Sequence, residues 1–356
     1  MRILETITAL SHEFGTTDYV RGGGGNTSCK NENTLWVKPS GTILGNLRPE
    51  AFVAMDRQKL SELYTIEPPS DSSSRETLIK EKMEQAVLPD SSGRASVEAP
   101  LHDSLSARYV VHTHPAIVNG MTCAKEGKAI CRELFPSALW LDYIDPGYTL
   151  CMKVRDEIQN YMTGNGCEPS LLFLKNHGVF AAADEADEIR ELYADVMTKL
   201  KAKYEQAGIS MELTVGEKPD HEHLTEACNC IRDAIGNPDL SVAAGGEFNP
   251  AAGPISPDHI VYSKSYAYIG VPTKQGISDF KAKHGYSPQV IAFDKAVFGV
   301  ADSEKGAGLA LELAQDGALV EQLAAGFGGI DYMTGRAREF IEHWEVESYR
   351  KKQIEN

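Results

Sequence analysis

The sequence predicts an α/β protein built from about two domains. At 356 residues the chain exceeds the usual size of a single hydrophobic core. Short apolar runs typical of buried strands, at 109–112 and 170–174, alternate with longer amphipathic segments typical of helices, such as 184–206. A charged segment with two glycines and a proline, 209–223, follows that helix. We therefore expect a first domain at 1–208, a linker at 209–223 and a second α/β domain at 224–356.

Composition and charge exclude several classes of partner. The formal net charge is −16 and the chain has no long Lys/Arg cluster, so nucleic acid is not an expected partner. No apolar run is long enough to span a bilayer, and residues 1–14 resemble an amphipathic helix rather than a secretory signal. Seven cysteines without regular spacing indicate reduced thiols. These features predict a cytoplasmic protein that does not bind a membrane.

The segment 109–115 gives the first indication of function. His112 and His114 follow two valines, and side chains two apart on a strand point to the same face. Such a pair could hold a metal ion, although an isolated His-x-His also occurs among ordinary surface or core histidines. A metal site needs a third ligand. His177 is the candidate, because an apolar strand delivers it into a turn at Gly178.

A carboxylate lies close to the histidine strand in the sequence. Ser96 is a candidate N-cap for a short helix, and this helix would carry Glu98 in its first turn. Two interpretations of Glu98 remain open. It is a carboxylate stabilised by the helix macrodipole, or it folds back to the metal and acts as a base.

Two loops carry the residue types of an anion site. Four glycines at 22–25 precede Asn26, and Lys38 to Thr42 form a second loop one strand later. Glycines allow backbone N–H groups to approach an anion, and Asn, Ser and Thr add donors. A flexible glycine turn is the alternative for the first loop alone. We expect an anion site if the two loops meet.

An internal similarity relates the two halves of the chain. Residues 176–184 match 294–302, and residues 109–114 match 259–264. The three candidate ligands would then correspond to Tyr262, Lys264 and Lys295, which do not suit a divalent cation. The second domain is thus predicted to be a degenerate copy of the first that has lost its metal.

Five motifs occur in an order that resembles the class II aldolase/adducin family. They are Gly25-Asn26-Thr27-Ser28, Lys38-Pro39-Ser40-Gly41, Ser96-Val97-Glu98 with His102, His112-x-His114 and Asn176-His177-Gly178. Within the family the whole chain is similar to the aldolase part of the bifunctional rhamnulose-1-phosphate aldolase/lactaldehyde dehydrogenases. This closer similarity includes residues 253–259 and 342–347.

The resemblance implies a three-layer α/β/α fold with a mixed sheet. It also implies zinc (Zn²⁺), or another divalent metal, bound by His112, His114 and His177, with Glu98 as the catalytic acid/base. Gly25, Asn26, Ser40, Gly41 and Ser96 match the positions that bind substrate phosphate. Val97 departs from the family by replacing a small polar residue found in some of the aldolases.

The function implied is that of a zinc-dependent aldolase that cleaves a ketose 1-phosphate to dihydroxyacetone phosphate and an aldehyde. A homo-oligomer, dimer or tetramer, is the expected assembly. Pentulose-phosphate 4-epimerase, dehydratase and decarboxylase reactions on the same scaffold are alternatives, and so is a non-catalytic adducin-like module. The three histidines and Glu98 argue against the module, which has no need of a metal-accessible carboxylate.

Overall fold

A computed structural model describes residues 2–344 and 351–354 of the chain. The chain divides into two compact units. The first comprises residues 1–118 and 128–200, and the second comprises residues 119–127 and 201–356. Within the described residues, no helix is long and apolar enough to cross a membrane. Residues 345–347, which belong to the predicted C-terminal motif, lie outside the described residues.

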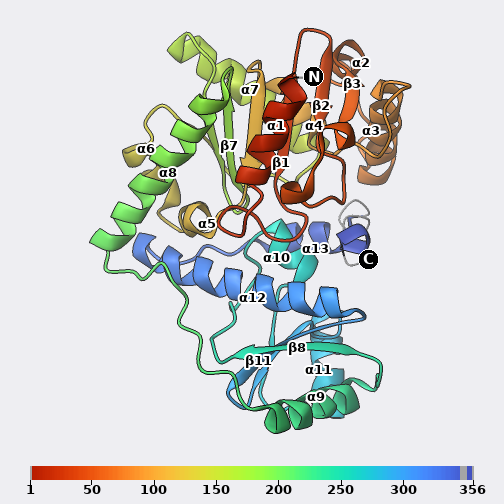
Figure 1. Cartoon of the computed structure of the whole chain (residues 1–356), viewed down its shortest axis with the longest axis vertical. Helices are drawn as coiled ribbons and strands as arrows, with labels where there is room; N and C mark the ends of the chain where they lie inside the picture. The colour runs from red at the N-terminus through yellow and green to blue at the C-terminus, as the bar shows by residue number, and fades with distance from the viewer. Residues whose placement is uncertain (1, 345–350, 355–356) are drawn as a thin grey trace. The chain divides into compact units, whose positions relative to one another are not determined.

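The first unit is built on a seven-stranded mixed sheet in the order β3-β2-β1-β4-β7-β6-β5. Figure 1 labels β1, β2, β3 and β7 of this sheet. All neighbouring strands are antiparallel except β5 and β6, which are parallel. The strands are β1 (Asn26–Lys30), β2 (Thr34–Val37), β3 (Val53–Asp56), β4 (Tyr109–Thr113), β5 (Leu139–Leu141), β6 (Leu171–Leu174) and β7 (Gly178–Ala183). The first eight α-helices along the described chain are α1 (Arg2–Glu13), α2 (Arg57–Glu62), α3 (Ser72–Ala86), α4 (Ala99–Ser104), α5 (Ala116–Thr122), α6 (Gly127–Leu134), α7 (Tyr148–Asn165) and α8 (Ala186–Gln206), of which α5 and α8 run from the first unit into the second.

Helices cover both faces of this sheet. On one face Leu101 of α4 and Val154 of α7 pack against Val110 and Phe180 in a continuous apolar cluster. On the other face Tyr193 of α8 lies beneath β4, where its hydroxyl donates to the carbonyl of Val111 at 3.2 Å. The predicted α/β/α layering with a mixed sheet is therefore confirmed.

The second unit contains a four-stranded sheet in the order β8-β11-β10-β9. Its strands are β8 (Ser241–Gly246), β9 (Tyr268–Ile269), β10 (Val290–Phe293) and β11 (Ala296–Ala301). Helices α9 (His221–Ile235) and α11 (Lys274–His284) pack on one face through Ile231 and Ile277. Helix α12 (Glu304–Ala324) packs on the other through Ala314 and Ala318. The remaining helices are α10 (Pro257–Tyr262) and α13 (Gly335–His343).

This second sheet repeats half of the first. In the first sheet β6 and β7 form an antiparallel hairpin, β4 pairs antiparallel with β7, and the edge strand β5 pairs parallel with β6. In the second sheet β10 and β11 form the hairpin, β8 pairs antiparallel with β11, and the edge strand β9 pairs parallel with β10. Thus β8, β9, β10 and β11 correspond to β4, β5, β6 and β7. Each hairpin leads into a helix of 21 residues, α8 or α12. The topology supports a duplicated half-domain that lacks β1, β2 and β3.

One of the two predicted correspondences is wrong. Residues 257–262 form helix α10, so the segment 259–264 is not a counterpart of β4. Tyr109 of β4 pairs with Ala183, and Ser241 of β8 pairs with Ala301, the residue that matches Ala183 in the second hairpin. Strand β8 is therefore the counterpart of β4. The positions that match His112 and His114 are consequently Ala244 and Gly246, rather than Tyr262 and Lys264. The match between 176–184 and 294–302 agrees with the hairpin topology, and Lys295 remains the counterpart of His177.

The segment predicted as a linker is partly helical. Helix α9 begins at His221, and the side chain of Asp220 caps it by accepting from the backbone N–H of His223. Before this helix, the N–H of Gly216 donates to the carbonyl of Glu247 at 2.8 Å, which holds the segment beside the end of β8.

Candidate metal centre

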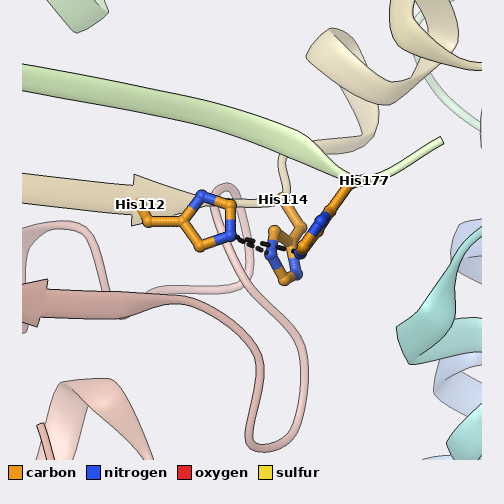
Figure 2. Close-up of side chains that lie close together, drawn as sticks. All are labelled: His112, His114 and His177. Atoms are coloured by element: carbon orange, nitrogen blue, oxygen red, sulfur yellow. Dashed lines mark hydrogen bonds between the residues drawn. The ribbon is translucent and has the colours of Figure 1, made fainter. Parts of the chain in front are cut away.

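Three histidines converge at the end of β4 (Figure 2). His112 lies on the strand, His114 follows it directly, and His177 comes from the turn between β6 and β7. The Nε2 atom of His112 lies 2.9 Å from Nε2 of His114 and 3.3 Å from Nε2 of His177. Among the described residues, these three form the one group of His, Cys, Asp or Glu side chains arranged to hold a metal ion.

The hydrogen bonding of His112 shows what this group is suited to bind. Its Nδ1 lies 2.9 Å from the carbonyl oxygen of Val179, which can only accept, so Nδ1 carries the hydrogen. The lone pair then lies on Nε2 and faces the other two rings. Burial lowers the pKa of His112, which favours the neutral imidazole that ligates metals. Three neutral imidazoles around one point fit a divalent cation with an open coordination position.

The backbone of the hairpin brings His177 close to β4. Asn176 has a left-handed backbone with φ of 53°, a conformation that Asn tolerates better than most residues. Gly178 lies so close to β4 that an added Cβ would be 2.3 Å from the carbonyl oxygen of Thr113 and 2.7 Å from Cδ2 of His114. Glycine at 178 is therefore required for the three rings to meet.

Glu98 faces the three histidines. Its Oε1 lies 3.4 Å from Nε2 of His112 and 3.7 Å from Nε2 of His177, and the side chain is 16% exposed. Burial opposes ionisation of Glu98, whereas interaction with the protonated forms of His112 and His177 favours it and holds the pKa of Glu98 well below its usual value. The structure thus places a carboxylate next to the candidate metal centre.

The short helix after Glu98 begins later than expected. Helix α4 starts at Ala99 and Glu98 is its N-cap residue, so Ser96 does not cap this helix as predicted. The hydroxyl of Ser96 instead accepts from the N–H of Glu98 at 3.3 Å. That bond fixes the turn that carries Glu98.

The side chain of Asn26, a predicted phosphate ligand, contacts Glu98. Its backbone pairs with His112 across β1 and β4, and its Nδ2 donates to Oε2 of Glu98 at 3.1 Å. The other carboxylate oxygen, Oε1, is left to face the histidines. Oδ1 of Asn26 is buried and has no hydrogen-bond partner among the described residues. In this structure the Asn26 side chain therefore orients Glu98.

Two buried residues behind the site, His102 and Lys30, have no role that the sequence predicts. The Nδ1 atom of His102 and the hydroxyl of Ser28 share a hydrogen bond of 2.8 Å. Burial lowers the pKa of His102 to about 3. Lys30 is 3% exposed, and its Nζ donates to the carbonyls of His102 and Leu105 at the end of α4. A lysine on a strand gives no sequence signal for this capping contact, because the carbonyls that it meets are more than 70 residues away.

The two predicted anion loops meet. Lys38 donates from Nζ to the carbonyl of Gly23 at 3.3 Å and from its backbone N–H to Thr27 at 3.0 Å. Residues Pro39 and Ala95 pair as an isolated bridge, which brings Ser40 next to the segment that contains Ser96. Gly25 and Gly41 have positive φ of 71° and 76°. The glycine turns and the hydroxyls predicted to hold phosphate thus belong to adjoining segments.

Comparison with known proteins gives the family. Residues 5–202 match the Class II Aldolase and Adducin N-terminal domain. The chain belongs to this family. A solved structure similar to the chain is the N-terminal class II aldolase domain of a conserved protein from Thermoplasma acidophilum, with 22% identity and a TM-score of 0.48. The similarity covers 56% of this chain and 92% of that one.

Other relatives differ in their described roles. A solved L-fuculose-1-phosphate aldolase from Thermus thermophilus is 16% identical to this class II aldolase-family chain, with a TM-score of 0.38. The similarity covers 56% of this chain and 92% of that one. YuxG of Bacillus subtilis (strain 168), an uncharacterized oxidoreductase, is 26% identical over 167 residues. That match covers 44% of this chain and 23% of YuxG, so the chain spans less than a quarter of that protein.

Proposed function

We propose that this chain is a divalent-metal-dependent aldolase, with zinc as the metal, that cleaves a ketose 1-phosphate to dihydroxyacetone phosphate and an aldehyde. The observation that carries the proposal is the position of Glu98, whose Oε1 lies 3.4 Å and 3.7 Å from two nitrogens of the three-histidine group. A purely structural metal site has no need of a free carboxylate beside its ligands. An acid/base next to a Lewis acid is what aldol cleavage requires.

Each part of the site has a role in this reaction. A cation held by His112, His114 and His177 would supply positive charge for the oxygens of the substrate on which negative charge develops. Glu98 would take and return the proton that moves when the carbon–carbon bond breaks. Asn26 holds one oxygen of Glu98 at 3.1 Å and so presents the other to the reacting atoms.

The adjoining loops would bind the phosphate. Gly25 and Gly41 take left-handed backbone conformations, which favour glycine and can turn N–H groups toward an anion, and Ser40 and Ser96 add hydroxyls. Lys38 is only 3% exposed and joins the two loops through the Gly23 carbonyl. We assign the phosphate to these segments because they combine glycine turns, hydroxyl donors and the buried Lys38 side chain. They also lie close to β1, which pairs with the strand that carries His112.

Metal analysis followed by product assays tests the proposal. The purified chain should contain one zinc or similar divalent ion, and it should release dihydroxyacetone phosphate from a panel of ketose 1-phosphates. A chelator should abolish this release and added metal should restore it. His112→Ala should lose the metal, whereas Glu98→Gln should keep the metal and lose at least about 100-fold in kcat, the usual contribution of a general acid or base.

His223→Ala is the matched control. His223 is a half-exposed histidine of α9 that pairs with Asp294 at 2.9 Å, and its removal should change neither metal content nor activity. A metal-free but folded wild-type chain would refute the site. A metal-loaded chain that releases no dihydroxyacetone phosphate from any ketose would refute the aldolase and favour epimerisation, dehydration or decarboxylation at the same centre.

A further inference from the structure

The phenyl ring of Phe180 lies flat against the imidazole of His112. Their centroids are 3.7 Å apart and their planes differ by 10°. The two residues face each other across β4 and β7, so both side chains project from the same face of the sheet. Aromatic pairs more often meet edge to face or with a wide offset, at centroid distances of about 4.5–7 Å. A parallel contact this close restricts the plane that the imidazole can take.

Two contacts together determine where the free nitrogen of His112 points. The bond between Nδ1 and the Val179 carbonyl fixes one atom of the ring, but by itself it leaves the ring able to tilt. The flat contact with Phe180 removes this tilt, because a tilted imidazole would run into the phenyl ring. Nε2 is then aimed at His114 and His177, whose rings stand at 70° and 78° to that of His112. The imidazole is thus held ready for a cation.

Helix α4 packs against Phe180. The imidazole of His102 meets the phenyl ring at a centroid distance of 5.4 Å and an angle of 64°, which is an edge-on contact. His102 is itself held by the Ser28 hydroxyl at 2.8 Å, and all three side chains are fully buried. The N-cap residue of the same helix is Glu98. One helix therefore carries the carboxylate of the site and supports the ring that contacts a metal ligand.

The second unit shows the same position without a metal ligand beside it. Phe298 of β11 matches Phe180 and is also fully buried. Across the sheet it pairs with Ala244, the counterpart of His112. Its ring packs on Phe293, at a centroid distance of 5.2 Å and an angle of 34°. A phenyl ring at this position therefore belongs to the core of both sheets, and in the first sheet it also contacts an imidazole.

We propose that Phe180 is a positioning residue for the metal centre, whose ring holds the His112 imidazole in the plane in which Nε2 can bind the cation. Phe180 has no ligand atom, so it acts only through His112. Its effect is on how tightly the cation is held and with what geometry. The inference rests on the proposed metal centre, and it does not depend on which reaction takes place there.

Cobalt binding to the full chain tests this proposal. Co²⁺ binds the same nitrogen ligands as Zn²⁺, and its visible absorption reports the arrangement of those ligands. Phe180→Leu keeps an apolar side chain but removes the flat ring. We expect the dissociation constant for Co²⁺, measured by competition with a chelator, to rise by about 10- to 100-fold and the absorption spectrum to change.

Phe298→Leu is the matched control. It makes the same change at the equivalent strand position, so it should lower the melting temperature about as much as Phe180→Leu does, while cobalt affinity and spectrum stay those of the wild type. Unchanged cobalt affinity in Phe180→Leu, or an equal loss of affinity in both variants, would overturn the proposal. A wild type that binds cobalt but releases no dihydroxyacetone phosphate would refute the aldolase alone.

Nuclear magnetic resonance adds a measurement that needs no substitution of Phe180. Protons above the face of a phenyl ring resonate upfield, so the proton on Cε1 of His112 should lie upfield of its position in free neutral imidazole. The sample is the full chain with carbon-13-labelled histidine, treated with a chelator, and the signal is assigned by its loss in His112→Ala. An unshifted signal would overturn the proposal even if Phe180→Leu failed to fold.

Discussion

At the level of single residues, the metal centre depends on how closely two backbones approach at Gly178. Gly178→Ala would place a Cβ 2.3 Å from the Thr113 carbonyl oxygen and 2.7 Å from the His114 ring. The hairpin must move away from β4, so the three nitrogens can no longer meet. We expect the metal dissociation constant, measured by competition with a chelator, to rise at least about tenfold. Gly164→Ala in α7, which meets nothing within 4 Å, should bind metal like the wild type. Equal affinity in both variants would contradict this account.

Asn26 offers a second test at this scale, since its amide holds Glu98. Asn26→Ala removes a hydrogen bond to a carboxylate, an interaction of about 1.5–3 kcal/mol, and should lower kcat by about 10- to 100-fold. Asn26→Asp places a second carboxylate beside the first, which raises the pKa of Glu98 and should move the acid limb of the pH–rate profile to higher pH. Asn165→Ala removes an amide that donates to the Tyr161 carbonyl at the exposed end of α7, and it should change neither kcat nor the acid limb. An unshifted acid limb in Asn26→Asp would argue against Glu98 as the base.

At the level of elements, Lys30 ties the end of α4 to strand β1. Burial lowers its pKa to about 7, whereas lysine in an unfolded chain titrates near about 10.4. Between these values the unfolded chain holds a proton that the folded chain lacks, so the free energy of unfolding should rise with pH across this window. Lys30→Met removes this contribution and also leaves two buried carbonyls unpaired, at a cost of about 1–3 kcal/mol.

Urea unfolding at about pH 7 and about pH 9.5 checks this expectation. The stability difference between the wild type and Lys30→Met should be larger at the higher pH. Lys59→Met is the matched control, because Lys59 donates to the carbonyl of Gln85 at an exposed site. It should lower stability by less than about 0.5 kcal/mol at either pH. A difference for Lys30→Met that shrinks as pH rises would refute the assignment.

Some elements could be predicted from the sequence because local and tertiary preferences agree in them. The valines before His112 form the strand that their β-branched side chains favour, and the spacing of two then fixes the shared face of the histidines. The segment after residue 256 shows the opposite case. Ile260 and Val261 suggested a strand, but Pro257 in the first turn and Asp258 beside it start helix α10. The true counterpart of β4, Ser241–Gly246, has too few large apolar residues to be recognised.

The contacts that complete the site lie beyond local pattern. Asn26 and Glu98 are 72 positions apart, and they meet only because β1 pairs with β4 while the turn before α4 folds back over it. The sequence supplied the residue types for the metal centre, and the sheet order decided which of them touch. This is why the histidines were predictable, whereas the role of Asn26 as a partner of Glu98 was not.

At the level of the whole molecule, the repeated sheet predicts one metal ion per chain. The positions in the second unit that match the three ligands carry Ala244, Gly246 and Lys295, and none of these side chains suits a divalent cation at neutral pH. Backbone also fills the equivalent space, because a Cβ on Gly246 would be 1.8 Å from the carbonyl oxygen of Gly216. Elemental analysis of the full chain should therefore give one bound metal in the wild type and none in a His112→Ala, His177→Ala double variant. A second equivalent, or one that persists in the double variant, would mean that the second copy has retained a metal site of its own.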